Sequence, residues 1–316
     1  MTKVVCIGEL LIDMVCCDID QGLVKGENFI KKAGGAPANV AATVSKLGGQ
    51  STFIGKVGQD AFGEFLIQTL SCVGVDTQGI IQDPVNTTTM AFVALEQGGE
   101  RDFQFNRGVD GLLTRDEINI DIHQPDLYHF GSATALLPGQ THDTYLTLIN
   151  ELYEAGQFIS MDPNYRHALW TEEAFKAQMY TCLPKANLLK VSEEELLILG
   201  QSTSQTKALK ALHQRGVPFI LVTMGAKGCL ISSHEKSTVI PSVTITSIDS
   251  TGAGDAFIGA VLWWLAKQGG APTCNFDTLI HAVQRANTVG AMVCEKLGAI
   301  AALPSLSDLE QRMGTQ

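Results

Sequence analysis

The feature that most constrains the fold of this chain is a regular alternation of two kinds of segment. Short apolar runs rich in β-branched residues, which predict strands, alternate with longer segments whose apolar residues follow the spacing of a helix. Strands are expected at 4–8, 52–57, 126–131, 157–162, 187–191 and 219–224, and helices at 37–48, 60–73, 139–155, 171–182 and 203–215. This order predicts an α/β fold with a mainly parallel central sheet covered by helices on both faces.

Two segments interrupt the alternation. Residues 11–33 and 87–108 alternate polar and apolar positions, which predicts the strands of a small, half-exposed sheet, and the "QGGE" stretch at 97–100 predicts a turn between two of them. Each segment is too short to fold alone, so we expect the two to form a lid beside the main sheet. No linker rich in Pro, Gly or Ser divides the chain, which favours one domain over residues 1–316.

Composition excludes several classes of function. A formal net charge of −11 and a pI near 5.1 argue against nucleic acid as a partner, since such binding needs clustered Lys and Arg. The longest apolar stretch, 256–266, falls short of the roughly 20 residues that cross a bilayer, and the amino terminus has no signal-peptide pattern. Eight cysteines without a CxxC pair suggest reduced thiols. We therefore expect a soluble, cytoplasmic protein without a membrane partner.

The stretch "DSTGAGD" at 249–255 carries the strongest chemical signal, because an apolar helix follows it at once. A glycine-rich turn at the start of a helix directs unpaired N–H groups and the positive end of the helix dipole at one point, where phosphate can bind. Asp255 would lie in the first helical turn, kept ionised by the same field, and could accept the proton of an attacking hydroxyl. The alternative is that Asp255 is a helix cap and the glycines make a tight turn.

A similar arrangement occurs near the amino terminus, in "AGGAPANVAATVSKLGG" at 33–49. Paired glycines precede a helix that starts near Pro37, and Asn39 in its first turn offers a donor and an acceptor to a hydroxyl-rich ligand. Asp13 is expected at the end of the first strand, where polar groups would converge at the carboxyl ends of parallel strands. The chain has neither GxxxxGK[ST] nor GxGxxG after the first strand, so P-loop and dinucleotide-binding motifs are missing.

Together, "GGAPAN" and "DSTGAGDAF" resemble the two signatures of the PfkB carbohydrate kinase family, and "GKVGQDAFG" (55–63) and "VTMGAKG" (222–228) lie between them. The resemblance covers essentially the whole chain. It implies a ribokinase-like three-layer α/β/α sandwich with a small β-sheet lid, and ATP-dependent phosphorylation of a sugar or nucleoside hydroxyl. It also implies that Asp255 is the general base and that the amides of Gly252, Ala253 and Gly254 form an anion hole.

The same resemblance implies further binding positions for ATP, magnesium and a monovalent cation. Glu195 in "KVSEEEL" matches a residue that supports magnesium, which this resemblance implies is contacted through water, and Ser192 stands where Asn is typical. The ATP-binding positions that it implies are Lys190, Ser192, Thr223, Gly225, Gly228 and, near adenine, Asn287. Asp249 and Thr251 resemble a loop that holds a monovalent cation such as K⁺, although Asp and Thr also favour simple turns.

Three stretches, "GELLID", "DFQFNRG" and "DPNYRHALW", look most like those of bacterial fructokinases, which implies fructose as the sugar. On this interpretation the sugar lies under the lid, held by Asp13, Gly34, Gly35, Asn39, Arg107, Asn164 and Arg166. Two alternatives stay open: 2-keto-3-deoxygluconate kinase or another sugar kinase of the family, and a sugar-binding regulator that has lost catalysis. A homodimer also stays open, since a half-exposed lid sheet has an apolar face to cover.

Overall fold

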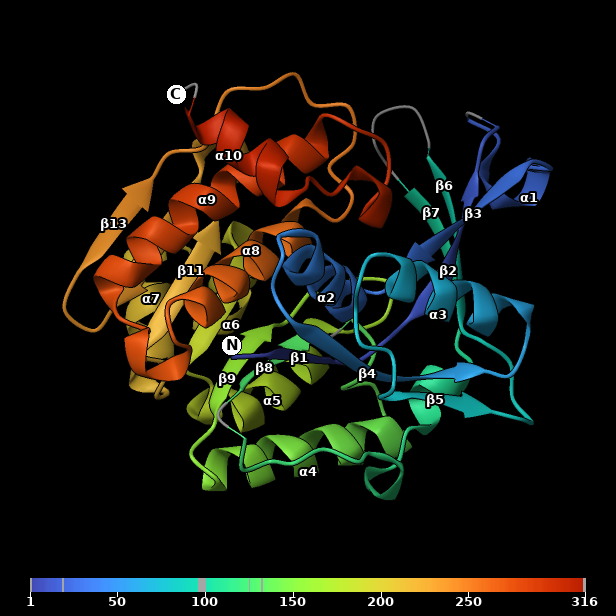
Figure 1. Cartoon of the computed structure of the whole chain (residues 1–316), viewed down its shortest axis with the longest axis horizontal. Coiled ribbons are helices and arrows are strands. Elements are labelled where there is room, and N and C mark those ends of the chain that lie inside the picture. Colours follow the sequence, from blue (N-terminus) through green and yellow to red (C-terminus); the bar gives the residue numbers. More distant parts are fainter. Residues whose placement is uncertain (1, 19, 96–100, 125, 132, 315–316) are drawn as a thin grey trace.

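The computed structural model describes residues 2–18, 20–95, 101–124, 126–131 and 133–314, and these form two sheets with helices around the larger one (Figure 1). The larger sheet has the order β13-β12-β11-β10-β9-β8-β1-β4-β5 within the described residues. Its strands from β11 to β5 are parallel, and β12 and β13 add an antiparallel edge. The strands are β1 (Val4–Ile7), β4 (Ser51–Gly58), β5 (Ile80–Asp83), β8 (Leu127–Gly131), β9 (Phe158–Asp162), β10 (Leu188–Ser192), β11 (Phe219–Thr223), β12 (Cys229–Ser233) and β13 (Ser237–Ile240).

Helices cover both faces of this sheet because successive residues of each central strand point to opposite sides, and both sides are apolar. In β1, Val4 packs into one core cluster and Val5 into the other. The first cluster joins the sheet to α2 (Ala36–Lys46), α3 (Ala61–Cys72), α8 (Ala253–Lys267), α9 (Phe276–Cys294) and α10 (Leu306–Gly314). The second joins it to α4 (Gln140–Glu154), α5 (Glu172–Cys182), α6 (Glu193–Gly200) and α7 (Gln205–Gln214). The result is a three-layer α/β/α sandwich (Figure 1).

The smaller sheet, called the lid sheet here, has the order β3-β2-β6-β7 in the described residues. Its strands are β2 (Leu11–Cys16), β3 (Phe29–Gly34), β6 (Met90–Leu95) and β7 (Arg101–Asn106), with a short helix α1 (Gly22–Lys25) between β2 and β3. It contains both segments that depart from the sequence alternation, which confirms their pairing into one sheet. The Lys31 ammonium lies 3.8 Å from the centroid of the Phe65 ring, so β3 packs against α3. The "QGGE" turn lies outside the described residues.

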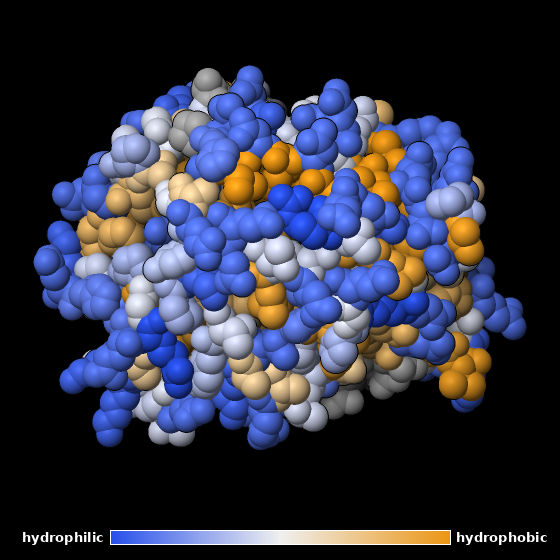
Figure 2. Space-filling model, turned by 90° about the horizontal axis from the view of Figure 1, so that it is seen from below, coloured by the Kyte–Doolittle hydropathy of each residue, from blue (hydrophilic) through white to orange (hydrophobic). Residues whose placement is uncertain are grey.

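The predicted strands and helices of the main sheet are confirmed to within about two residues at their ends. The sequence analysis did not foresee β5, α1, α6, β12, β13, α9 or α10, several of which lie at the edges of the fold. Among the described residues, no helix is both long enough and apolar enough to cross a membrane. The face seen in Figure 2 is largely hydrophilic, and its hydrophobic residues form groups interrupted by polar ones.

Candidate active site

The amino terminus of α8 forms the centre of the candidate site. Gly252 is the residue before the helix, with φ +75°, and a Cβ at this position would lie 2.5 Å from the Cβ of Ala299. Only glycine therefore fits this turn without a shift of the neighbouring chain. The Ala253 amide donates to the Ser250 carbonyl at 3.2 Å, whereas Gly254 lies in the first turn, where amides have no acceptor within the helix. Of the predicted anion-hole amides, that of Ala253 is thus already engaged in a turn.

Asp255 lies in the first turn of α8, as predicted, and its surroundings shift its pKa. Burial raises the pKa of Asp255 to about 6, and the charge of Asp162 adds to this increase. The hydrogen bond from Asn39 and the positive charges of Lys190 and Arg166 lower the pKa but do not cancel the effect of burial. Burial is the largest of these effects, because it disfavours the charged form of the carboxyl group. Asp255 is still mainly ionised at neutral pH, as a general base must be.

Asn39 contacts Asp255 directly, although the two residues are 216 positions apart in the sequence. The Asn39 Nδ2 donates to Asp255 Oδ2 at 2.8 Å, and Asn39 is 7% exposed. One helical turn further along, Thr43 of α2 faces Gly259 of α8, where a Cβ would lie only 2.6 Å from the Thr43 Cβ. The absence of a side chain at Gly259 lets the two helices approach closely enough for the Asn39–Asp255 hydrogen bond. The two glycine-rich motifs therefore meet at one site.

A buried ion pair lies beneath the first turn of α8. The Lys190 ammonium donates to Asp162 Oδ2 at 2.8 Å, and the two side chains are 10% and 2% exposed. A Cβ on Gly254 would lie 3.1 Å from Lys190 Nζ, so the ammonium group sits next to the candidate anion hole. Although burial opposes its charge, the carboxylates of Asp162, Glu195 and Asp255 raise the pKa of Lys190. Lys190 therefore brings a fixed positive charge to the place where an anion would bind.

Of the residues predicted to hold the sugar, Asp13 differs most from expectation. The first strand ends at Ile7, and Asp13 lies in lid strand β2, opposite Lys32 of β3, rather than at the end of the first strand. The prediction was wrong because the chain leaves the main sheet after Ile7 and enters the lid sheet. Its carboxylate contacts Gly34, since the space for a Gly34 side chain is filled by Asp13 Oδ2. Gly35 follows as the residue that precedes α2, with φ +111°.

The two arginines expected at the sugar differ in how they are held. The Arg107 guanidinium donates to the carbonyls of Thr134 and Pro138 at 3.1 and 3.0 Å, and its Nε lies 3.7 Å from Asp110 Oδ2. It thus joins the end of the lid sheet to the loop after β8. Arg166 donates to the carbonyl of Tyr165 at 3.3 Å, and its charge acts on Asp255. Asn164, with φ +47°, turns the chain just after β9.

Most of the residues predicted to bind ATP lie in or just after β10 and β11, and one lies on α9. Thr223 donates to the Val191 carbonyl at 3.3 Å, and Gly225 and Gly228 flank the turn between β11 and β12. Asn287 of α9 is 7% exposed and donates to the carbonyls of Ile240 and Pro241, each at 3.0 Å. This places Asn287 beside the segment that follows β13, where it orders the backbone.

Ser192 and Glu195 form a capping box at the start of α6. The Ser192 Oγ accepts from the Glu195 amide, and Glu195 Oε2 accepts from the Ser192 amide at 2.7 Å. Glu195 Oε1 accepts from the Tyr165 amide, also at 2.7 Å. Both oxygens of Glu195 are thus occupied by backbone amides. Ser192, which stands where Asn is typical, still caps the helix, because Ser and Asn are both favoured N-cap residues.

The loop with Asp249 and Thr251 has the hydrogen bonds of a tight turn. Asp249 Oδ1 accepts from the amide and hydroxyl of Thr251 at 2.9 and 2.6 Å, and Oδ2 accepts from the Gly298 amide at 2.9 Å. Burial opposes the charge of Asp249, but these hydrogen bonds outweigh it and lower its pKa. Across the part of the chain that is described, no three His, Cys, Asp or Glu side chains come together as a metal site.

Two buried acidic residues near the site were missed by the sequence analysis. Asp162 lies within the quoted "DPNYRHALW" stretch but was given no role. Glu9, from "GELLID", is 2% exposed and its Oε1 accepts from the Ala36 amide at 3.3 Å, at the start of α2. Burial raises the pKa of Glu9 to about 7. The available signal was a carboxylate at or just after an apolar strand, which suggests a charge at the sheet edge.

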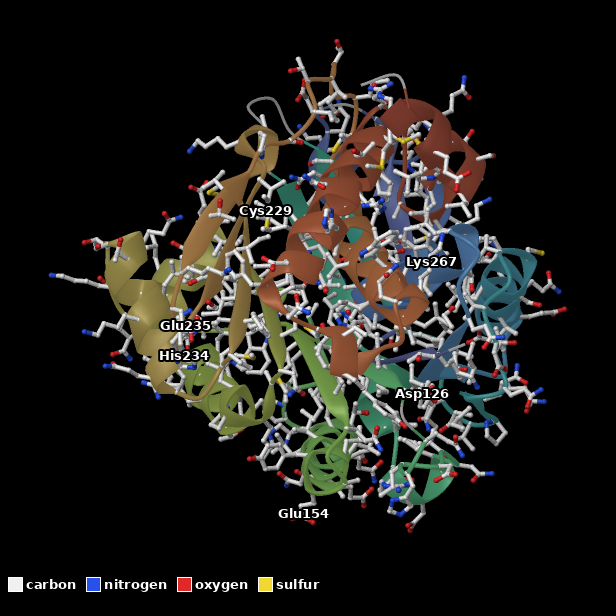
Figure 3. The ribbon with its side chains drawn as sticks, turned by 60° about the vertical axis from the view of Figure 1, so that its left-hand side comes forward. Asp126, Glu154, Cys229, His234, Glu235 and Lys267 are labelled. Atoms are coloured by element: carbon white, nitrogen blue, oxygen red, sulfur yellow. The ribbon has the colours of Figure 1, made fainter. Side chains whose placement is uncertain are left out.

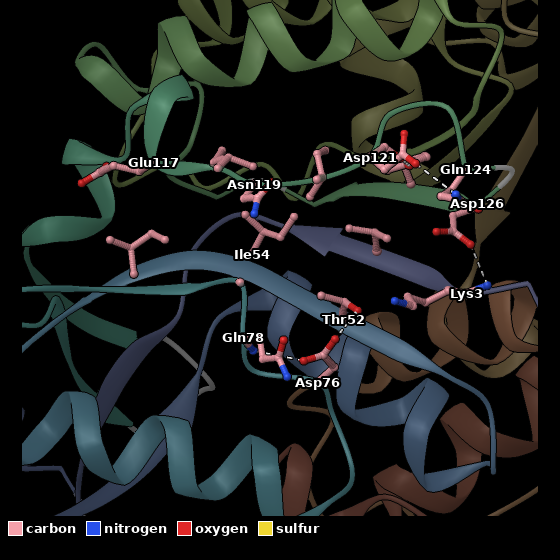
Figure 4. Close-up of a pocket in the computed structure, with 16 residues that line it drawn as sticks. Lys3, Thr52, Ile54, Asp76, Gln78, Glu117, Asn119, Asp121, Gln124 and Asp126 are labelled. Atoms are coloured by element: carbon pink, nitrogen blue, oxygen red, sulfur yellow. Dashed lines mark hydrogen bonds between the residues drawn. The ribbon is translucent and has the colours of Figure 1, made fainter.

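A cavity of about 310 Å³ lies elsewhere, near the amino ends of β1, β4 and β8 (Figure 4). Its lining residues include Lys3, Thr52, Ile54, Asp126 and Tyr128. Ligands of parallel α/β sheets bind at the carboxyl ends of the strands, where Asp162, Lys190 and Asp255 meet. We therefore assign the candidate site by its converging polar groups and not by the size of this cavity.

Comparisons with known proteins agree with this geometry. Residues 1–306 match the sequence profile of the pfkB family carbohydrate kinase. The chain is 38% identical over 315 residues to fructokinase-1 of Zea mays, covering 98% of this chain and 96% of the maize protein.

Solved structures of similar proteins extend the comparison to the fold. A fructokinase from Xylella fastidiosa with bound ATP has a TM-score of 0.89 at 29% identity, covering 99% of both chains. A fructokinase from Vibrio cholerae O395 bound to fructose, ADP and calcium has a TM-score of 0.87 at 32% identity, covering 98% of both chains. A double mutant of the Vibrio protein holds fructose, ADP and potassium, and a putative ribokinase II from E. coli holds ATP and Mg²⁺; both have TM-scores of 0.87.

Proposed function

The chain belongs to the pfkB family of carbohydrate kinases, and on that premise we propose that it transfers the γ-phosphoryl group of ATP to the 6-hydroxyl of D-fructose. The observation that carries the chemistry is the convergence of Asp255, Asn39 and Lys190 at the first turn of α8. The fructose assignment is supported by the similarity to fructokinases over nearly the whole chain.

In the proposed reaction, Asp255 acts as the general base. One carboxylate oxygen, Oδ2, accepts from Asn39, which leaves Oδ1 to accept the proton of the sugar hydroxyl. The hydroxyl oxygen then forms a bond to the γ-phosphorus, the bond between this phosphorus and the β,γ-bridging oxygen breaks, and ADP leaves. Charge on the transferred group would be stabilised by the start of α8, with Gly252, Ala253 and Gly254, and by Lys190.

We propose that the sugar lies between the lid sheet and the carboxyl edge of the main sheet. Asp13 and Gly34 are in contact, and Gly35 and Asn39 lie where β3 passes into α2, so these residues can offer acceptors and donors to sugar hydroxyls from one side. Asn164 and Arg166 follow β9 on the other side. Arg107 is held by two carbonyls, so we expect it to fix the edge of the lid sheet as well as to face the sugar.

For the nucleotide, we propose a binding path along the ends of β10 and β11. Lys190 and Ser192 would face its phosphates. Its phosphates or ribose would also be contacted by Thr223, Gly225 and Gly228. Asn287 would support the segment near adenine. Magnesium would come with ATP and neutralise phosphate charge. Because both Glu195 oxygens accept hydrogen bonds from backbone amides, the residues present fit a magnesium ion that Glu195 contacts through water.

Two further proposals concern the monovalent cation and the domain organisation. We propose that Asp249 and Thr251 border a K⁺ site. We also propose that residues 1–316 form one domain.

The first experiment measures conversion of ATP to ADP by the purified protein, with Mg²⁺ and K⁺, against fructose, 2-keto-3-deoxygluconate, ribose, mannose, glucose and adenosine. We expect strong activity with fructose and weak activity with the others. A preference for another sugar would overturn the fructose assignment and keep Asp255 as the base. Sugar binding without turnover on any of them would contradict catalysis and favour a regulator.

A further inference from the structure

The buried ion pair beneath the first turn of α8 contains a residue to which no role has been assigned. We propose that Asp162 is a positioning residue for phosphoryl transfer, which holds the Lys190 ammonium group next to Gly254 so that it faces the γ-phosphoryl group. This inference rests on the proposed function. It extends that function because it explains how a flexible lysine is fixed at the anion site.

Strand register brings the two charges together. Leu188 of β10 lies opposite Ser160 of β9, and this parallel register carries Lys190 opposite Asp162 two residues later. Phe158 and Leu188 belong to the core cluster shared with α2 and α8, so the alternation of side chains directs Asp162 and Lys190 to the same face. The pair therefore points at the start of α8 and not at the helices on the other face.

The environment of the pair argues against a purely stabilising role. A buried ion pair loses hydration that its attraction barely repays, so replacing it with neutral side chains is often no worse for stability. Asp162 Oδ1 is also buried and has no hydrogen-bond partner among the described residues, which is costly for a carboxylate. Retaining such a pair beside Gly254 is better explained by the charge that it brings to the anion site.

The groups that face Asp255 make the proposal testable. Asn39 of α2 donates a hydrogen bond to Asp255. Three charged side chains also shift the pKa of Asp255: Asp162 at the end of β9, Lys190 of β10, and Arg166 in the loop after β9. His129 of β8 is neutral near pH 7 and adds no charge to this group of residues, since burial and the charge of Lys190 lower its pKa to about 3. Asp162 raises the pKa of Asp255 and Lys190 lowers it, so removing either charge should move the titration of Asp255 in opposite directions.

The experiment compares Asp162→Asn, Lys190→Met and the double variant with the wild-type enzyme. Glu117→Gln is the matched control, since Glu117 pairs with the buried Lys56 at 2.6 Å on the wall of the cavity in Figure 4. We expect Lys190→Met to lower kcat by on the order of 10²- to 10³-fold. Asp162→Asn should lower it by roughly ten- to a hundredfold, because the lysine loses its orientation. The acid limb of the pH profile should shift down in Asp162→Asn and up in Lys190→Met.

The double variant separates function from stability. It removes both buried charges, so we expect its unfolding midpoint to recover relative to the single variants while kcat stays low. Glu117→Gln should lose stability without a change in the pH profile. Recovery of kcat in the double variant, or pH shifts in the same direction for both single variants, would overturn the proposal.

A binding measurement keeps this proposal distinct from the sugar assignment. Calorimetry compares ADP with the β,γ-imido analogue of ATP, which carries a γ-phosphoryl group that is not transferred. We expect Asp162→Asn and Lys190→Met to weaken binding of the analogue by about tenfold or more, and to change ADP binding much less. An equal loss for both nucleotides, or no loss, would contradict the placement of Lys190. If no sugar in the panel is phosphorylated, the proposed function is refuted. The nucleotide-binding result would still show whether Lys190 faces the γ-phosphoryl group, because it does not depend on the sugar.

Discussion

At the scale of single residues, the site depends on how one carboxylate is held. Asp255 is desolvated by the protein and stabilised by Asn39 on one oxygen, so its pKa of about 6 lies between those of an exposed aspartate and a histidine. A base with this pKa is ionised at neutral pH and still binds a proton more strongly than an exposed aspartate does. This combination is well suited to accepting a hydroxyl proton near pH 7.

Replacement of Asp255 tests this role. We expect Asp255→Asn to fold and bind ATP like the wild type, because the amide has nearly the same shape, and to lower kcat by about 10²- to 10⁴-fold, because the base is lost. Steady-state kinetics and nucleotide titration measure the two effects. Asp277→Asn, in the first turn of the neighbouring helix α9, is the matched control and should keep full activity. Near-normal turnover of Asp255→Asn would refute the assignment.

The pH dependence of the wild-type enzyme gives a second prediction for the same residue. Below about pH 6, Asp255 becomes protonated and can no longer accept the hydroxyl proton. We therefore expect kcat/KM to be level near neutral pH and to fall about tenfold per pH unit on the acid side. A profile that stays level down to pH 5, under conditions in which the protein remains folded, would contradict this account.

At the scale of elements, the distance between α2 and α8 determines whether the two motifs meet. Gly259 and Thr43 lie one turn along their helices from Asp255 and Asn39, and the contact leaves no room for a methyl group. A glycine with positive φ precedes each helix, Gly35 before α2 and Gly252 before α8. These local turns set the direction of the helices, whereas Gly259 sets the distance between them.

The variant Gly259→Ala should push the helices apart. Although alanine favours a helix, its Cβ would lie 2.6 Å from the Thr43 Cβ, so we expect a loss of about 1 to 3 kcal/mol in unfolding free energy. We also expect roughly a tenfold lower kcat, because Asn39 moves away from Asp255. Urea unfolding and kinetics measure both. Adding Thr43→Gly should restore part of the activity, and unchanged activity in Gly259→Ala alone would contradict this role of the contact.

The amino terminus of α3 is a second junction between elements, where one carboxylate ties the main sheet to the lid sheet. Asp60 Oδ1 accepts from the amides of Phe62 and Gly63 at 3.0 and 2.8 Å, and Oδ2 accepts from the Thr88 amide at 2.8 Å, just before β6. We expect Asp60→Ala to cost about 1 to 2 kcal/mol in unfolding free energy near pH 7.

The pH dependence of this loss is fixed by the sign of the shift. Burial opposes the charge of Asp60, but hydrogen bonds from Thr88, Gly63 and Phe62 outweigh it and lower the pKa below 3.8. The contribution of the carboxylate is therefore present above the unfolded pKa and is lost as the pH falls through the lower folded value. Denaturant titrations of wild type and Asp60→Ala should differ most near neutral pH and converge in acid. A constant difference would contradict an ionised cap.

At the scale of the whole molecule, two apolar cores on either side of one sheet determine which groups reach solvent. All eight cysteines are free: Cys17 and Cys72 are exposed, whereas Cys6, Cys16, Cys182 and Cys229 are buried. Figure 3 shows Cys229 on β12, with His234 and Glu235 at the turn toward β13. Burial raises the pKa values of Cys6, Cys182 and Cys229, which further suppresses the reaction of these three thiols.

Thiol labelling of the folded protein therefore reports on the packing. We expect an alkylating reagent to modify Cys17 and Cys72 quickly, and Cys6, Cys182 and Cys229 only after denaturation. Mass spectrometry of proteolytic fragments identifies the sites, and a reductant should leave the melting temperature unchanged because all eight thiols are free. Rapid labelling of Cys229 in the native state would contradict the packing of the sheet against α9.

Local signals in the sequence determined the central elements of this protein and the location of its principal site, but not several elements at the edges of the fold. The two-residue period of the strands, the helical spacing between them and the glycines before α2 and α8 act through backbone geometry within a few residues. They predicted the mainly parallel sheet, the lid segments and Asp255 in a first helical turn. The family motifs, which are also contiguous, indicated the class of reaction.

Tertiary structure alone decided which of these residues meet and what charge they carry. Asn39 reaches Asp255 across 216 residues, Asp162 reaches Lys190 through strand register, and Asp13 belongs to the lid sheet because the chain leaves the main sheet after Ile7. Strand order, helix spacing and burial depend on contacts between distant segments, so no short window of sequence contains them. For the same reason, the burial that raises the pKa of Asp255 could not be seen in its local sequence.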